Sequence, residues 1–169
     1  MKKLAVLVCL LVLASLALAD GYEKGKIAVG PLLGYGPNGL AIGAHGEYGV
    51  TDKISAGGIA SYSSKTEDLV WYKWTVTYIT VGAQGNYHFK PAQKFDPFVG
   101  LILGYDVASA SVTWADQYSY MQSYTSVAAA SEMVIGGDVG ANYYFSPKMA
   151  GVARVGYPFY FSAGINFVF

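Results

Sequence analysis

The amino-acid sequence predicts an all-β protein, an eight-stranded antiparallel up-and-down transmembrane β-barrel. Three observations support this fold class: an apolar leader comes first, alternating segments with turn residues between them follow, and aromatic residues recur where those segments end. Mean hydropathy is positive, at +0.33. Beyond the leader, however, no run approaches the roughly 18 apolar residues that a membrane-spanning helix needs. Strand periodicity therefore decides the class.

Residues 1–19 have the pattern of a secretory signal peptide. Two lysines open it, an uncharged apolar stretch follows, and Ala17-Leu18-Ala19 matches the small-residue motif at which such leaders are cleaved. Cleavage there also removes Cys9, the chain's only cysteine, so disulfide and thiolate chemistry are excluded from the mature chain. The remaining residues, 20–169, suffice for one domain, the barrel.

Eight alternating segments are expected to form strands. They cover about 26–35, 40–50, 53–63, 71–89, 97–107, 130–145, 149–157 and 160–169. Compact turns are expected at 51–52, 90–95 and 146–148, whereas residues 64–69 are expected to form a polar loop and 108–129 a long irregular one. Alternation of short and long connections is typical of outer-membrane barrels, although the short connections at 36–39 and Pro158 depart from it.

Aromatic residues gather where the predicted strands meet the compact turns. Because such rings favour the membrane–water interface, they predict a girdle at the periplasmic end. Its members are Tyr48, Tyr87, Phe89, Tyr143 and Phe145. A second aromatic group lies in the predicted external loop: Trp114, Tyr118, Tyr120 and Tyr124. Those rings either contact a partner or solute, or pack on one another and extend the outer girdle.

The polar faces of the strands are expected to line the lumen, because they carry small and hydrogen-bonding residues rather than dense charge. Arg154 is the chain's only arginine, and placing it against lipid would cost about 2–4 kcal/mol at the midplane. We therefore predict an inward Asp138–Arg154 pair, with Glu47 as a further partner and His45 on the same polar side. This network is either a gate or a structural means of satisfying buried charge, and the structural interpretation is favoured.

The C-terminal residues resemble a known signal. Alternating Phe161, Ile165, Phe167 and Phe169 are similar to the terminal motif by which outer-membrane barrels are recognised by the barrel-assembly machinery. Residues 95–105 resemble a strand of small OmpA- and OmpX-like barrels, and residues 142–148 resemble their strand-to-turn segment. The resemblance implies location in the cell outer membrane, contact with its lipids and with that machinery, and a monomer. No peptidoglycan-binding domain is expected after the barrel.

The preferred hypothesis is a non-enzymatic protein with a structural or surface role, because eight strands leave an interior just wide enough for side chains. One alternative is a narrow porin-like conduit for small or hydrophobic solutes. Another is a lipid-modifying outer-membrane enzyme, since enzymes of the resembled class use a histidine. His88, however, lies at the turn end, away from an outer-leaflet substrate. No metal-ligand spacing, phosphate-binding loop or nucleophile elbow indicates a cofactor, and near-neutral charge indicates no nucleic-acid partner.

Overall fold

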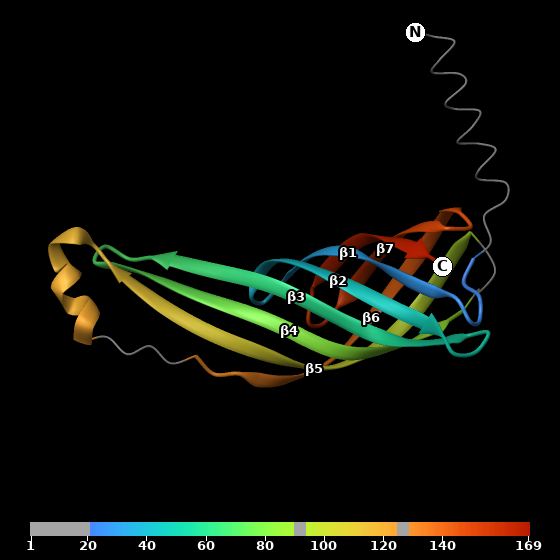
Figure 1. The fold of residues 1–169 in the computed structure, drawn as a ribbon, viewed down its shortest axis with the longest axis horizontal. Coiled ribbons are helices and arrows are strands. Elements are labelled where there is room, and N and C mark those ends of the chain that lie inside the picture. Colours follow the sequence, from blue (N-terminus) through green and yellow to red (C-terminus); the bar gives the residue numbers. More distant parts are fainter. Residues whose placement is uncertain (1–20, 90–93, 125–128) are drawn as a thin grey trace, which may run out of the picture.

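In the computed structural model, which describes residues 21–89, 94–124 and 129–169, eight strands form a closed antiparallel barrel (Figure 1). The strands are β1 (Ile27–Gly36), β2 (Gly39–Gly49), β3 (Ile54–Asp68), β4 (Tyr72–His88), β5 (Phe95–Trp114), β6 (Glu132–Ser146), β7 (Met149–Gly156) and β8 (Phe161–Val168). Each strand pairs with its sequence neighbours, and β8 pairs with β1 to close the wall. The predicted eight-stranded up-and-down barrel is confirmed. The predicted signal peptide, residues 1–19, lies outside the described residues.

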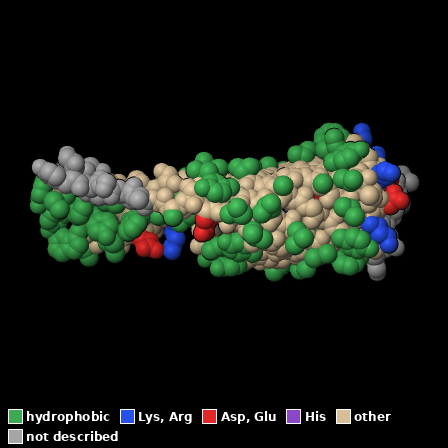
Figure 2. All heavy atoms as spheres, turned by 90° about the horizontal axis from the view of Figure 1, so that it is seen from below, with side chains coloured by type: hydrophobic (Ala, Val, Ile, Leu, Met, Phe, Trp, Pro, Cys, Tyr) green, Lys and Arg blue, Asp and Glu red, His purple; other side chains and the backbone are tan. Residues whose placement is uncertain are grey.

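The strands alternate strictly between the two faces of the wall. In β1 the odd-numbered residues, such as Ile27 and Leu33, are exposed, whereas Ala28 and Leu32 are buried inside. Exposed fractions reach 74% for Leu101 and 72% for Ile135 on the outer face. Figure 2 shows these apolar side chains spread over the barrel wall. The outer face is therefore apolar, the reverse of a water-soluble barrel. The interior combines polar residues with a buried apolar cluster that consists of Leu32, Ile59, Phe98, Ile102 and Val152.

The strands approach each other very closely at the seam where the wall closes. Val29 is opposite Phe167, and Leu32 is opposite Gly164, across the β1–β8 pair. Between these pairs Gly30 lies so close to β8 that an added Cβ would overlap the carbonyl oxygen of Ile165. A glycine is therefore required here for close backbone approach rather than for an unusual dihedral angle.

Two predicted loops begin as strand, so the expectation of irregular structure was wrong for residues 64–68 and for residues 108–114. Residues 64–68 continue β3, and residues 108–114 continue β5, before a 3-10 helix, η1 (Asp116–Tyr124). β2 pairs with β3 only as far as Ser63, and β6 pairs with β5 only as far as Asp106. Beyond this rim only β3, β4 and β5 remain paired, and they project as a three-stranded sheet (Figure 1). We call residues 64–77 and 107–124 the tongue. Among the described residues, no helix is long and apolar enough to span a membrane.

On its outward face the tongue inverts the polarity of the barrel wall. The β3–β4 and β4–β5 registers continue through the rim without a break, so each strand keeps its two faces. Within the barrel the outward residues of β4, such as Ile79 and Val81, are apolar, and the inward Thr80 is polar. Beyond the rim the side continuous with the lumen carries Trp74 and Val76, and Glu67 and Lys65 of β3 lie opposite them on that side. The other side carries threonines and serines, namely Thr75, Thr77, Ser109, Ser111 and Thr113. The inversion marks where the apolar wall ends.

Candidate functional site

The middle of the lumen is organised around Arg154 of β7. Its Nη1 donates to Oε1 of Gln84 at 2.9 Å and to Oδ2 of Asp138 at 3.4 Å. Its Nη2 lies 2.9 Å from Nδ1 of His45, and its Cζ lies 5.1 Å from the centre of the Phe98 ring. A guanidinium can only donate, so Nδ1 of His45 is the acceptor. The structure thus brings Asp138, Arg154 and His45 together across β2, β6 and β7.

Glu47 does not contact Arg154, contrary to the expectation that it would be a further partner. It belongs instead to a second buried cluster nearer the turn end of the barrel. Its Oε2 accepts hydrogen bonds from Ser55 Oγ at 2.8 Å and from Asn86 Nδ2 at 2.7 Å. His88 Nε2 lies 3.1 Å from Ser55 Oγ, and His88 Nδ1 lies 2.6 Å from Asp96 Oδ2. The imidazole of His88 therefore lies between two carboxylates, with Glu47 Oε2 4.0 Å from its Nε2.

Ser55, His88 and Asp96 have the connectivity of a nucleophile, base and orienting acid. Two observations argue against that chemistry. Glu47 competes with His88 for the single hydroxyl proton of Ser55, and all three residues are fully buried, so a substrate carbonyl has no approach. The hydrogen bonds of the cluster instead satisfy part of the polar groups that are buried here away from water. His88 stood out in the sequence, but Ser55 and Asp96 did not, because no motif links residues whose proximity depends on strand register.

Tyr22 closes the turn end of the lumen over this cluster. Its ring stacks on His88 with centroids 3.9 Å apart and planes 8° apart. Its hydroxyl lies 2.8 Å from the carbonyl oxygen of Thr51 and 2.6 Å from that of Ile54, which both act as acceptors. Burial, with the nearby carboxylates of Glu47 and Asp96, raises the pKa of Tyr22 to about 12. Residues just before β1 thus cap the barrel, a role that no sequence pattern indicated.

We expect alkaline pH to release this cap. The pKa of Tyr22 is raised above its ordinary value of 10.0, so its contribution to docking is complete below pH 10 and is lost as pH rises towards about 12. Tyrosine-selective ¹³C NMR in micelles should show one ring carbon titrating about two pH units above the exposed tyrosines. That resonance should be missing from Tyr22→Phe. A Tyr22 titration near pH 10 would contradict the buried, hydrogen-bonded phenol.

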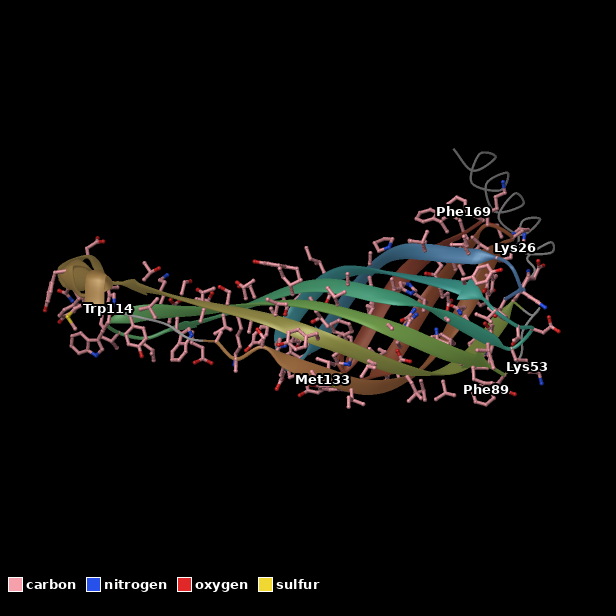
Figure 3. All side chains as sticks on the ribbon, turned by 60° about the horizontal axis from the view of Figure 1, so that its bottom comes forward. Lys26, Lys53, Phe89, Trp114, Met133 and Phe169 are labelled. Atoms are coloured by element: carbon pink, nitrogen blue, oxygen red, sulfur yellow. The ribbon has the colours of Figure 1, made fainter. Side chains whose placement is uncertain are left out.

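The predicted girdle residues all lie near the turn end. Tyr48, Tyr87, Phe89 and Tyr143 are exposed, Phe145 is half-buried, and the rings form neighbouring pairs, Tyr87 with Phe89 and Tyr143 with Phe145. Figure 3 shows Phe89 at the same end as Lys26, Lys53 and Phe169. The residues of the predicted assembly signal, Phe161, Ile165, Phe167 and Phe169, are exposed on the outer side of the wall at and after β8.

The second aromatic group lies at the far end of the tongue, well beyond the rim. Figure 3 places Trp114 there, whereas Met133 marks the rim on β6. Trp114 packs on Tyr72 with centroids 5.1 Å apart, and Tyr118 meets Trp71 edge-to-face at 5.2 Å. Tyr120 is exposed. Tyr124 ends η1, and its side chain lies outside what the structure describes.

No family model matches the chain, and neither does any curated protein. Solved structures do match in fold. The outer membrane protein OprG from Pseudomonas aeruginosa is 13% identical with a TM-score of 0.66, covering 88% of this chain and 98% of that one. The N-terminal β-barrel domain of Pseudomonas aeruginosa OprF is 15% identical with a TM-score of 0.58, covering 88% and 100%. Ail, the attachment invasion locus protein of Yersinia pestis, solved with the heparin analogue sucrose octasulfate, is 14% identical with a TM-score of 0.56, covering 87% and 100%. The resemblance to small OmpA- and OmpX-like barrels is thus confirmed at the level of the fold.

Proposed function

We propose that this protein is an integral outer-membrane barrel with a closed lumen and a role in membrane structure or surface contact. The proposal rests on one observation about the barrel wall. The wall exposes Leu101, Ile135 and their outward neighbours, and it buries Arg154 and Asp138 inside. An apolar surface of this extent, encircling the barrel, suits contact with lipid rather than with water. Within the barrel, closure also pairs every strand on both sides, which removes the open sheet edges that hydrocarbon does not tolerate.

The compact turns and the chain's C-terminal end define the periplasmic side in this proposal, and the tongue projects outward. Short periplasmic turns and longer external segments are the usual arrangement of such barrels. The aromatic rings at the turn end then lie at the membrane–water interface on the periplasmic side. The exposed alternating residues of β8 suit recognition by the barrel-assembly machinery. Similarity to OprF, OprG and Ail supports the outer-membrane assignment, and Ail's description as an attachment protein supports a surface role.

The lumen is proposed to be non-conducting. Phe98, Ile102, Arg154 and His45 are all buried inside it, and Arg154 makes contacts with three other strands. These bulky side chains cross the interior of a barrel whose strand number leaves room for little else. A solute conduit is therefore the less supported alternative. Catalysis is less supported too, because the serine and histidine that could perform it are sealed between Glu47 and Tyr22.

A charge placed on the wall tests the membrane assignment. Leu101→Arg is expected to lower the free energy of unfolding in lipid bilayers by about 2–4 kcal/mol, because Leu101 lies midway along the barrel part of β5 and faces outward. Ser109→Arg, on the outward face of the same strand in the tongue, should change it by less than about 0.5 kcal/mol. Urea titration followed by heat-modifiable migration on gels measures both. Equal tolerance of the two substitutions, or a wild-type protein that is monomeric without detergent, would overturn the proposal.

A further inference from the structure

The far end of the tongue is an exposed apolar surface. We define the tip cluster as Leu69, Val70, Trp71, Tyr118 and Tyr120. Val70 is 82% exposed, Tyr120 65% and Trp71 52%. The edge-to-face contact of Trp71 with Tyr118 holds the strand turn against η1. Figure 2 shows hydrophobic side chains gathered at this end of the molecule.

The part of the tongue between the rim and the tip cluster, which we call the stalk (residues 64–68, 72–77 and 107–114), has a polar outward face that separates the tip cluster from the apolar barrel wall. Its outward face carries serine and threonine, and its charges are matched within the sheet: Lys65 lies 3.0 Å from Glu67, and Lys73 lies 3.3 Å from Asp68. From Asp106 at the rim to Trp114 the strand extends about 27 Å, taking about 3.4 Å per residue. Because the sheet continues outward (Figure 1), the tip cannot return to the hydrocarbon layer that surrounds the barrel.

We propose that the tip cluster docks onto the surface of a second, zwitterionic lipid bilayer that faces the membrane holding the barrel. This inference rests on the proposed function, which sets the orientation of the tongue. Tryptophan and tyrosine favour the membrane–water interface, and protruding aliphatic residues such as Leu69 and Val70 bury themselves just beneath it. In this arrangement the barrel wall lies in one bilayer, the stalk crosses the water between the membranes, and the tip cluster lies in the surface of the second bilayer.

The charge pattern favours a zwitterionic lipid surface over an anionic one or a charged polymer. Within residues 107–131 the sequence carries a single charged side chain, Asp116. The basic residue nearest the tip cluster, Lys73, is paired with Asp68. The tip thus presents no excess of positive charge with which to attract anionic lipid, sulfated polysaccharide or nucleic acid. Binding has to come from apolar and interfacial contact.

The tryptophans make the proposal directly measurable. All three, Trp71, Trp74 and Trp114, lie in the tongue, so fluorescence excited selectively in tryptophan reports on this part alone. The full chain is folded into nanodiscs of unlabelled lipid and mixed with phosphatidylcholine vesicles whose acyl chains are brominated. We expect a blue shift and quenching that saturate with vesicle concentration. Leu69→Asp with Val70→Asp keeps every tryptophan and should weaken the vesicle partition coefficient at least tenfold.

The matched control places the same two charges on the stalk, as Thr66→Asp with Ser111→Asp, and should bind vesicles as the wild type does. Equal quenching of both double variants overturns the proposal, as does stronger binding to anionic than to phosphatidylcholine vesicles. Association of nanodiscs through their tongues, without quenching by vesicles, would assign the tip to a second copy instead and also overturns it. Heat-modifiable migration on gels is measured in parallel to show whether the barrel has closed. If the wild-type barrel is closed but vesicles do not quench its tryptophans, only the docking proposal is refuted. If the wild-type chain never forms a closed barrel, the proposed function is refuted as well.

Discussion

Replacing Gly30 with alanine is expected to leave most of the chain unable to close its barrel. The added Cβ would overlap the carbonyl oxygen of Ile165, lie 2.7 Å from the carbonyl carbon and lie 3.2 Å from the Cα of Asn166. These are backbone atoms of β8, so no side-chain rotation relieves the overlap and the seam has to separate. A cost of about 4 kcal/mol or more follows, which is a large part of the stability of a small domain. The measurement is the fraction of heat-modifiable protein after folding into micelles.

Gly85→Ala is the matched control for this substitution. Gly85 lies in β4, also within the barrel wall, but its added Cβ would meet only the carbonyl oxygen of Ser55 at 3.8 Å, an ordinary contact. Its stability should change by no more than about 1 kcal/mol, and a lower entropy of the unfolded chain favours a small gain. If Gly30→Ala folds as completely as Gly85→Ala, then β1 and β8 do not approach each other as closely as the seam geometry requires.

Substituting methionine for Arg154 should destabilise the barrel by about 3–5 kcal/mol. The change removes the donor that Asp138, Gln84 and His45 share, and it leaves a carboxylate buried without its partner. Methionine keeps much of the volume beside Phe98, so the loss reports on charge and hydrogen bonding more than on packing. Far-ultraviolet circular dichroism during urea unfolding measures it, because the tryptophans lie in the tongue and do not report on the lumen.

A double-mutant cycle separates the pair from its surroundings. Combining Arg154→Met with Asp138→Asn removes the unpaired charge together with its partner, so part of the lost stability should return. A coupling free energy of about 1–3 kcal/mol is expected between the two sites. Phe159 is uncharged and packs against the apolar cluster that includes Phe98, so Phe159→Leu combined with Arg154→Met serves as the control cycle, and its coupling free energy should be smaller than that of the charged pair. A double variant as unstable as the sum of its single variants would show that the two side chains do not act as a pair.

The barrel and its two faces could be predicted because a period of two leaves no ambiguity where one face must be apolar. That alternation is enough to place Asp138 and Arg154 on the same side of the wall. The tongue could not be predicted in the same way. Residues 64–68 are polar and read as a loop, yet they pair with residues 73–77 of β4, and Thr66 meets Thr75 at 3.0 Å. Paired strands surrounded by water carry no lipid-facing signature.

The contacts inside the lumen were also beyond sequence reasoning. Ser55, His88 and Asp96 come from three strands, and Tyr22 comes from outside the strands altogether. Which inward residues meet depends on strand register and on the stagger of the closed barrel, and neither can be read from periodicity. For the same reason Glu47 was assigned to the correct face but to the wrong partner.

The pairing of β1 with β8 also constrains how the chain reaches its final state. Ala28 lies opposite Val168, so the closing contacts join positions about 140 residues apart. Strands so far apart in the sequence pair slowly, because the chain loses the entropy of forming a large loop before any stabilising contact between them forms. Until the last strand arrives, the first strand has an open edge able to pair with another molecule. Assembly therefore depends on protecting that edge during the interval between synthesis and closure.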